Sequence, residues 1–205
     1  MQPGKRHYRL SPSASELTVQ VFKDTSSLAA RLSHDHVIQA SQMTGVITWS
    51  DNASDCVVDV RVPILGLRVD PPHLRERLRL GSKLTDKDKR ETDKNMRAKS
   101  QLWSDRFPVI TVRSTSCAPK NGGLRVTFDM CIRGRTVSRA ADLTVTLEGD
   151  TLTAAGSFKA RATDFGFKPF SALLGALKNQ DEMLFSAKLV GSAPQGVGSP
   201  PPVAG

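Results

Sequence analysis

The chain of 205 residues has few aromatic side chains, only three cysteines and no long apolar run. It contains no stretch of about 18 apolar residues, the length that a membrane-spanning helix requires. The first dozen residues also lack the apolar core of a secretory signal. As written, the sequence therefore predicts a cytoplasmic protein, or a periplasmic one if the start is misplaced or a signal was removed.

Motifs that carry catalytic chemistry are missing as well. The cysteines, Cys56, Cys117 and Cys131, are odd in number and lack the CxxC spacing of zinc and redox sites, so we expect reduced thiols. There is no Gly-x-Ser-x-Gly elbow and no glycine-rich phosphate loop. Carboxylates are plentiful, but they occupy alternating, solvent-facing positions of predicted strands. These absences favour a protein that is not an enzyme and needs no cofactor.

Positive charge is concentrated in one segment. The chain carries a formal charge of +9, and residues 61–106 hold thirteen Lys or Arg against seven Asp or Glu. RNP, helix-turn-helix and zinc-finger patterns are absent, so we predict no nucleic-acid partner. A solvated helix face is one interpretation, and transient docking to an anionic membrane surface is another. For docking, the candidate residues are Arg75, Arg77, Arg79, Lys83, Lys87, Lys89 and Arg90.

Strict alternation of apolar and polar residues is the clearest positive feature. In residues 124–132, LRVTFDMCI, every even position is apolar, which places all the apolar side chains on one face of a strand. The same alternation recurs at 16–22, 59–63, 110–114, 142–148, 151–161 and 184–190. Many strands with one apolar face each favour closure into an antiparallel barrel. We therefore predict a mainly β fold, an eight-stranded antiparallel β-barrel with one or two helical excursions.

The predicted barrel interior combines bulky and small side chains, which leaves space for an apolar ligand. The residues concerned are Phe128, Phe158 and Phe185 together with Ala154, Gly156, Ala160, Ala162 and Ala187. The alternative is a filled barrel that acts as an interaction module through its basic 61–106 surface. The oligomeric state stays open, and a dimer is one of the states allowed.

Several other segments carry local predictions. Residues 28–32 are predicted to form a strand. Residues 73–103 have a helical period, with Thr85 and Asp88 at capping-box positions. Residues 167–180 offer a second helix, with leucines at helical spacing, which would serve as a lid or a plug. We place one domain at 1–191 and a disordered tail rich in Pro, Gly and Ser at 192–205.

Two histidines form the most polar short cluster. If the chain is extended at this point, His34 and His36 point the same way and offer two imidazoles to a metal, with His7 or His73 as a distant third ligand. Two ligands are too few to complete a site. The histidines are therefore interpreted as caps at strand ends that bond to backbone at the barrel rim, and no metal site is predicted.

The order of several short motifs resembles the YceI-like family. These motifs are LSHDHVI, TGVITWS, NMRAKSQLWSDRFPVITVRST, the turn at Arg133-Gly134-Arg135, and GSFKARATDFGFKPFSALLGALKNQDEMLFSAKLVG, within residues 8–190. The resemblance implies a lipocalin-like barrel that binds and carries or sequesters a polyisoprenoid or isoprenoid-quinone-type lipid without catalysis. Placing the family's apolar lumen on this chain gives the candidate ligand-binding residues Val19, Val21, Val58, Val60, Ile110, Val112, Val126, Phe128, Met130, Phe158, Phe165, Phe170 and Phe185.

Overall fold

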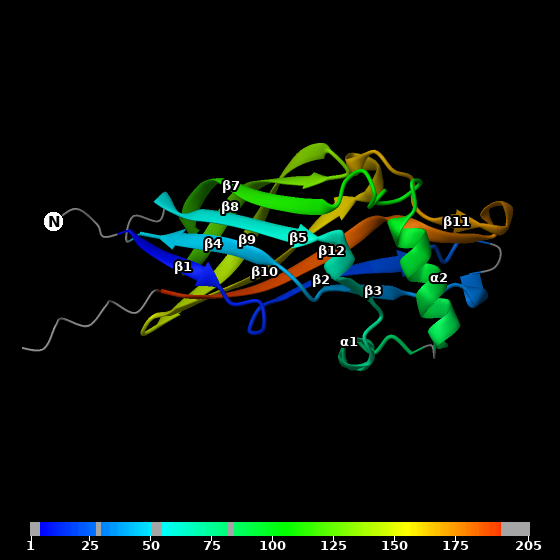
Figure 1. Cartoon of the computed structure of the whole chain (residues 1–205), viewed down its shortest axis with the longest axis horizontal. Coiled ribbons are helices and arrows are strands. Elements are labelled where there is room, and N and C mark those ends of the chain that lie inside the picture. The colour runs from blue at the N-terminus through cyan, green and yellow to red at the C-terminus, as the bar shows by residue number, and fades with distance from the viewer. Residues whose placement is uncertain (1–4, 28–29, 51–54, 82–83, 194–205) are drawn as a thin grey trace, which may run out of the picture.

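Strands form most of the described part of the chain (Figure 1). The computed structural model describes residues 5–27, 30–50, 55–81 and 84–193. Its strands are β1 (Arg6–Leu10), β2 (Glu16–Lys23), β3 (His36–Ala40), β4 (Thr44–Trp49), β5 (Val57–Pro63), β6 (Leu67–Val69), β7 (Val109–Lys120), β8 (Gly123–Ile132), β9 (Arg135–Glu148), β10 (Thr151–Arg161), β11 (Ser171–Ala172) and β12 (Leu177–Ser192). Every stretch singled out for its alternation lies within one of these strands, so those predictions are confirmed.

The sheet closes into an eight-stranded antiparallel barrel. Successive pairing runs β1-β4-β5-β7-β8-β9-β10-β12, and β12 returns to β1 through the partners Arg9↔Ser192 and Leu10↔Gly191. Strands β2, β3 and β6 then lengthen the wall at one end, where β2 pairs with β12, β3 with β2, and β6 with β3. The predicted mainly β barrel is confirmed, and its two ends differ.

Tight turns connect the long strands. Asn121 and Gly122 have φ of 48° and 76°, and Arg133 and Gly134 have φ of 55° and 72°, as two-residue hairpin turns of the primed type require. Along β8 the apolar side chains at even positions from Leu124 to Ile132 are all buried. The alternation in the sequence therefore corresponds to an inner face that packs as one core.

The basic segment contains two helices rather than one continuous helix. Helix α1 spans Pro72–Arg77 and α2 spans Asp86–Arg97, and Arg79 between them has a φ of 53° that no helix allows. The predicted capping box is confirmed, because Thr85 and Asp88 exchange backbone-to-side-chain bonds at the start of α2. Arg97 donates to the carbonyl oxygens of Ile64 and Leu67, at 2.7 Å and 3.1 Å, and so fixes α2 beside β6.

The predicted helix at 167–180 is wrong. The segment forms a hairpin in which Ser171 pairs with Lys178, with a 3-10 turn at Leu173–Gly175. Leu173 and Leu174 have φ of 51° and 55°, and their side chains are exposed. Leucine spacing suggested a helix, but the backbone hydrogen bonds of the segment are made with β12 and the turn instead. No lid or plug helix exists there.

Two smaller predictions are also wrong. The predicted strand at 28–32 contains a 3-10 helix at Ala30–Leu32, and residues 28–29 lie outside the described residues. Cys56 and Cys117 form a disulfide with their Cα atoms 6.0 Å apart, whereas Cys131 is free. The two paired cysteines are 61 positions apart in the sequence, so no local pattern indicates the bond, and the β5–β7 pairing brings them together.

The carboxyl end of the barrel extends slightly past the predicted domain boundary. Strand β12 ends at Ser192, and the Ala193 amide donates to the Asp150 carbonyl at 2.8 Å. Residues 194–205 of the predicted tail lie outside the described residues. Within the described ranges, no helix has the length and apolar character needed to span a membrane.

Candidate functional site

An apolar cavity runs along the barrel in two compartments. The inner one has a volume of about 140 Å³ and the outer one about 180 Å³. The compartments adjoin, and six residues line both: Val19, Ile38, Leu67, Ile110, Ile132 and Phe185. Each is similar in size to an apolar cavity of about 150 Å³ that holds one benzene molecule. Two compartments in series therefore suit an extended chain better than a single compact ring.

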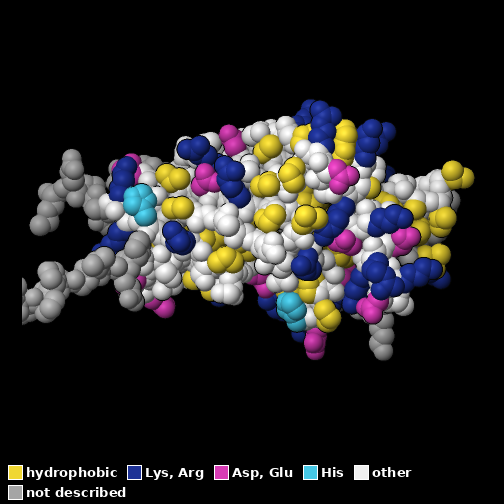
Figure 2. Space-filling model, viewed as in Figure 1, with side chains coloured by type: hydrophobic (Ala, Val, Ile, Leu, Met, Phe, Trp, Pro, Cys, Tyr) yellow, Lys and Arg dark blue, Asp and Glu magenta, His cyan; other side chains and the backbone are white. Residues whose placement is uncertain are grey.

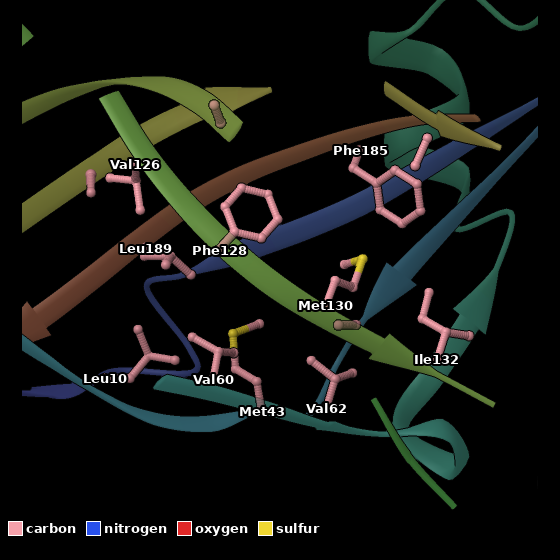
Figure 3. Packing of buried hydrophobic residues seen from close by; sticks show 14 of the residues in the cluster. Leu10, Met43, Val60, Val62, Val126, Phe128, Met130, Ile132, Phe185 and Leu189 are labelled. Atoms are coloured by element: carbon pink, nitrogen blue, oxygen red, sulfur yellow. The ribbon is translucent and has the colours of Figure 1, made fainter. Parts of the chain in front are cut away.

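Inward-facing side chains of the strands form the inner compartment. Figure 3 shows Val60, Phe128, Met130 and Phe185 pointing toward one another from β5, β8 and β12. Phe158 contacts two other rings, the edge of Phe128 and the face of Phe185, each with a centroid distance of 4.9 Å. These rings occupy one side of the lumen. Other lining residues have small side chains or none, namely Ala141, Gly156 and Ala187, and they leave space in the lumen.

Most of the sequence-predicted binding residues border this cavity. Twelve of the thirteen line it, namely Val19, Val21, Val58, Val60, Ile110, Val112, Val126, Phe128, Met130, Phe158, Phe170 and Phe185. Phe165 does not: it is 1% exposed at the end of the 3-10 helix Ala162–Phe165 and belongs to the packed core. The backbone turns there, so the strand alternation that placed the other residues does not apply.

Sequence reasoning missed several lining residues. Ile132 follows the same alternation as Met130 and could have been included on that basis. Ile38 and Leu67 come from the paired strands β3 and β6, whose short length conceals their period. Met96 comes from α2 and packs against the core at the side of the outer compartment. Helix α2 is therefore part of the cavity wall, which its charged sequence did not suggest.

Polar residues are concentrated in the lining of the outer compartment, whereas the inner one has only Thr18 and Ser186 as polar residues among its described lining residues. Those that line the outer compartment are His36, Thr92, Asn95, Gln101, Asn179 and Gln180. Gln101 donates to the Lys168 carbonyl and Gln180 to the Lys23 carbonyl, each at 3.1 Å. Among the described residues no Lys, Arg, Asp or Glu lines either compartment. The cavity thus has an apolar inner part and an uncharged polar mouth.

A buried network of hydrogen bonds supports one side of the mouth. Asp70 is fully buried, and its two carboxylate oxygens accept from His36 Nδ1 at 2.6 Å and from Arg75 at 2.8 Å. The amide of Val37 also donates to Asp70, at 3.0 Å. Burial alone would raise the pKa of Asp70, but the bonds from His36, Val37 and Arg75 outweigh it and lower the pKa.

The two histidines therefore have different surroundings. His36 bonds to a buried carboxylate rather than capping a strand through backbone. Burial, and then the neighbouring His36, lowers the pKa of His34. In the described part of the chain, no group of three or more His, Cys, Asp or Glu side chains is placed to hold a metal ion.

The predicted basic patch is not assembled as expected. Arg75 is buried against Asp70, Arg77 pairs with Glu16 at 2.5 Å, and Lys89 lies 4.0 Å from Asp86. Lys83 lies outside the described residues. The remaining three, Arg79, Lys87 and Arg90, are exposed. The single patch was predicted for a continuous helix over 73–103, and the structure has two helices and these pairings instead.

Comparisons with known proteins give one matching family model and several solved structures of similar fold. The family model described as YceI-like domain matches residues 8–190. BcnA of Burkholderia cenocepacia superposes with a TM-score of 0.65 at 14% identity, covering 88% of this chain and 98% of that one. A polyisoprenoid binding domain from Saccharophagus degradans gives 0.58 at 13% identity, covering 91% and 98%. The Campylobacter jejuni YCEI protein gives 0.53 at 12%, covering 77% and 84%. No curated protein matches the chain.

Proposed function

The chain belongs to the YceI-like domain family, and from this premise we propose that it binds a long apolar lipid, a polyisoprenoid or isoprenoid quinone, and carries or sequesters it without catalysis. The observation that carries the proposal is the pair of adjoining compartments, the inner one lined almost entirely by apolar residues and the outer one with polar residues at the mouth. The similarity to a polyisoprenoid binding domain supports the same ligand class.

Apolar burial alone provides enough free energy for this role. Each buried methylene contributes about 0.8 kcal/mol, and micromolar affinity corresponds to about 8 kcal/mol. Association costs at least about 4 kcal/mol in lost freedom. A chain of several isoprene units therefore reaches micromolar affinity with little polar chemistry, and cavity shape and length set its selectivity.

Titration of the full chain with farnesol tests this proposal. We expect saturable binding with a dissociation constant in the micromolar range or below. The rival function, a filled barrel that acts only as an interaction module, predicts no uptake at all. Absence of binding at the solubility limit of farnesol would therefore overturn the proposal in favour of that rival.

We further propose that the mouth docks weakly on anionic membranes, where such lipids reside. Leu173 and Leu174 project from the tip of the β11–β12 hairpin, and Lys168 and Lys178 flank this turn in sequence. Figure 2 shows hydrophobic side chains together with Lys and Arg at the end of the molecule where Figure 1 places β11. Exposed leucines enter the lipid boundary, and a lysine attracts anionic headgroups by about 1 kcal/mol. Lys168 is exposed, whereas Lys178 lies 3.8 Å from Asp24. This hairpin replaces the basic helix face as the candidate contact.

The disulfide supports a location in an oxidising compartment. Disulfides persist in the periplasm and outside cells, whereas the cytosol keeps most thiols reduced. The Cys56–Cys117 bond therefore favours the periplasm over the cytoplasm as the place where this protein works. A protein in the periplasm could take up its lipid from a membrane surface.

A further inference from the structure

One ring nitrogen at the cavity mouth has no hydrogen-bond partner among the described residues. His36 lines the outer compartment, and its Nδ1 bonds to Asp70 Oδ2 at 2.6 Å. Its other ring nitrogen, Nε2, takes part in none of the bonds formed within the described ranges. The side chain of His36 retains 14% exposure. A residue at the uncharged, polar mouth of the cavity therefore has one ring nitrogen without a partner among the described residues.

The surrounding bonds determine what this nitrogen offers. The carboxylate of Asp70 accepts hydrogen bonds from Arg75 and from the Val37 amide, and these bonds favour its ionised form. An ionised carboxylate can only accept hydrogen bonds. The hydrogen at the His36–Asp70 contact therefore lies on Nδ1. In a neutral imidazole the second nitrogen is then an acceptor. When the ring of His36 is neutral, its Nε2 therefore presents a lone pair rather than a hydrogen.

The ring is also held in a fixed orientation. Arg75 binds Asp70 and donates to the carbonyl oxygens of Asp35 and Leu80, at 2.9 Å and 3.1 Å. Asp70 itself has a φ of 51°, a left-handed conformation that costs free energy and that asparagine and aspartate tolerate best. A buried ion pair and a strained backbone thus keep one imidazole in place beside the cavity.

We propose that His36 Nε2 accepts a hydrogen bond from a hydroxyl group at the head of the bound lipid. The ligand class is then prenyl alcohols and prenylated phenols, with the chain in the barrel and the hydroxyl at the mouth. A diphosphate head fits poorly, because no Lys or Arg of the described residues lines the outer compartment. This inference rests on the proposed function and specifies the head of the same ligand.

Farnesol and farnesyl methyl ether separate the two claims. The ether has the same chain and oxygen, but it has no hydroxyl hydrogen to donate. We expect the wild-type protein to bind farnesol about fivefold more tightly than the ether, as one net hydrogen bond implies. Equal affinities would overturn the role of His36 while leaving the lipid-binding function intact. Failure of both probes to bind would overturn the function and this inference together.

His36→Asn is the matched variant, because its amide nitrogen keeps a donor near the Nδ1 position and places no atom at Nε2. We expect it to lose about fivefold in affinity for farnesol and to bind the ether as the wild type does. His73→Asn, the same change on the exposed face of α1, is the control and should keep the preference. A preference that survives in His36→Asn would assign the hydroxyl to another residue and overturn the proposal.

A measurement on the wild-type protein covers the case in which His36→Asn does not fold. Nitrogen-15 spectra report the state of each imidazole nitrogen. We expect the Nε2 resonance of His36 to shift upfield when farnesol is added, as for an acceptor that gains a hydrogen bond, and to move little with the ether. An identical response to both compounds would contradict the proposed bond.

Discussion

Phe158 and Phe185 stack face to face across the β10–β12 pair, with ring centroids 4.9 Å apart and planes 8° from parallel. Both rings line the inner compartment, so the stack forms a rigid part of its wall. Phe185 also borders the outer compartment. An apolar chain that enters from the mouth must therefore pass this residue, and substitutions near it report directly on occupancy.

Filling the inner compartment should abolish ligand binding. Ala187 borders the space next to this stack, so we expect Ala187→Phe to weaken farnesol binding at least tenfold with little loss of stability. Ala160 is buried on the same strand pair but borders neither compartment. Ala160→Phe is therefore the control, and it should cost about 1–3 kcal/mol in unfolding free energy through overpacking. Titration and urea unfolding of both variants check this, and normal binding by Ala187→Phe would contradict the assigned site.

Loss of the disulfide should destabilise the barrel. Cys56–Cys117 closes a long loop across β5 and β7, and such a cross-link contributes about 2–4 kcal/mol. We expect the double variant Cys56→Ser/Cys117→Ser to lose that amount in urea unfolding. Reducing agent should lower the stability of the wild type similarly and leave the double variant unchanged. Cys131→Ser is the control, and a wild type insensitive to reductant would refute the structural role of the bond.

Breaking the Asp70 network should be more costly than breaking an exposed ion pair. Asp70→Asn removes the buried charge that Arg75 binds at 2.8 Å, and breaking a buried pair costs about 3–5 kcal/mol. Asp142→Asn is the comparison, because Asp142 pairs with Lys120 and Arg125 at the surface, and we expect about 0–1 kcal/mol there. Similar losses of unfolding free energy in the two variants would show that the buried network stabilises the protein no more than an exposed ion pair does.

The same carboxylate predicts a dependence on pH. The pKa of Asp70 is lowered in the folded protein, so its stabilisation is complete above the unfolded value of 3.8 and is lost as pH falls through the lower folded value. We therefore expect the difference in unfolding free energy between wild type and Asp70→Asn to be constant near neutral pH and to shrink below about pH 4. A constant difference down to pH 2 would contradict the lowered pKa.

Membrane docking should depend on the hairpin tip. We expect Leu173→Ser/Leu174→Ser to reduce co-sedimentation with anionic vesicles several-fold and to leave farnesol binding intact. Leu65, which is 72% exposed on the 3-10 helix Ile64–Gly66, offers a control, and Leu65→Ser should bind vesicles like the wild type. High salt should weaken wild-type binding because it screens the lysines. Equal binding to neutral and anionic vesicles would contradict this part of the account.

The alternating strands were predictable because their pattern is local. In β8, each residue from Leu124 to Ile132 lies on the face that its position in the alternation indicates, and the lumen residues follow from the same rule. The rule failed where the backbone leaves the strand conformation. Phe165 lies in a 3-10 helix, and Leu173 and Leu174 adopt left-handed conformations that helical spacing cannot reveal.

Contacts between distant residues were not predictable from the sequence. Cys56 with Cys117, and Asp70 with His36, are joined only by the register of paired strands and the turn into α1. The sequence predicts His36 as a cap at the barrel rim, and its bond to Asp70, 34 positions away, leaves no local pattern that would indicate otherwise. A disulfide or a hydrogen bond between residues far apart in the sequence can be identified only when the fold is known.

Native mass spectrometry of the protein purified from its own cells tests the central claim most directly. The account predicts a fraction of molecules with one bound lipid, released on denaturation and identified as a prenyl chain with a hydroxyl or quinone head. Ala187→Phe purified in parallel should carry none, and Ala160→Phe should still carry the lipid. Protein recovered without any bound lipid, and unable to take up farnesol afterwards, would contradict the account.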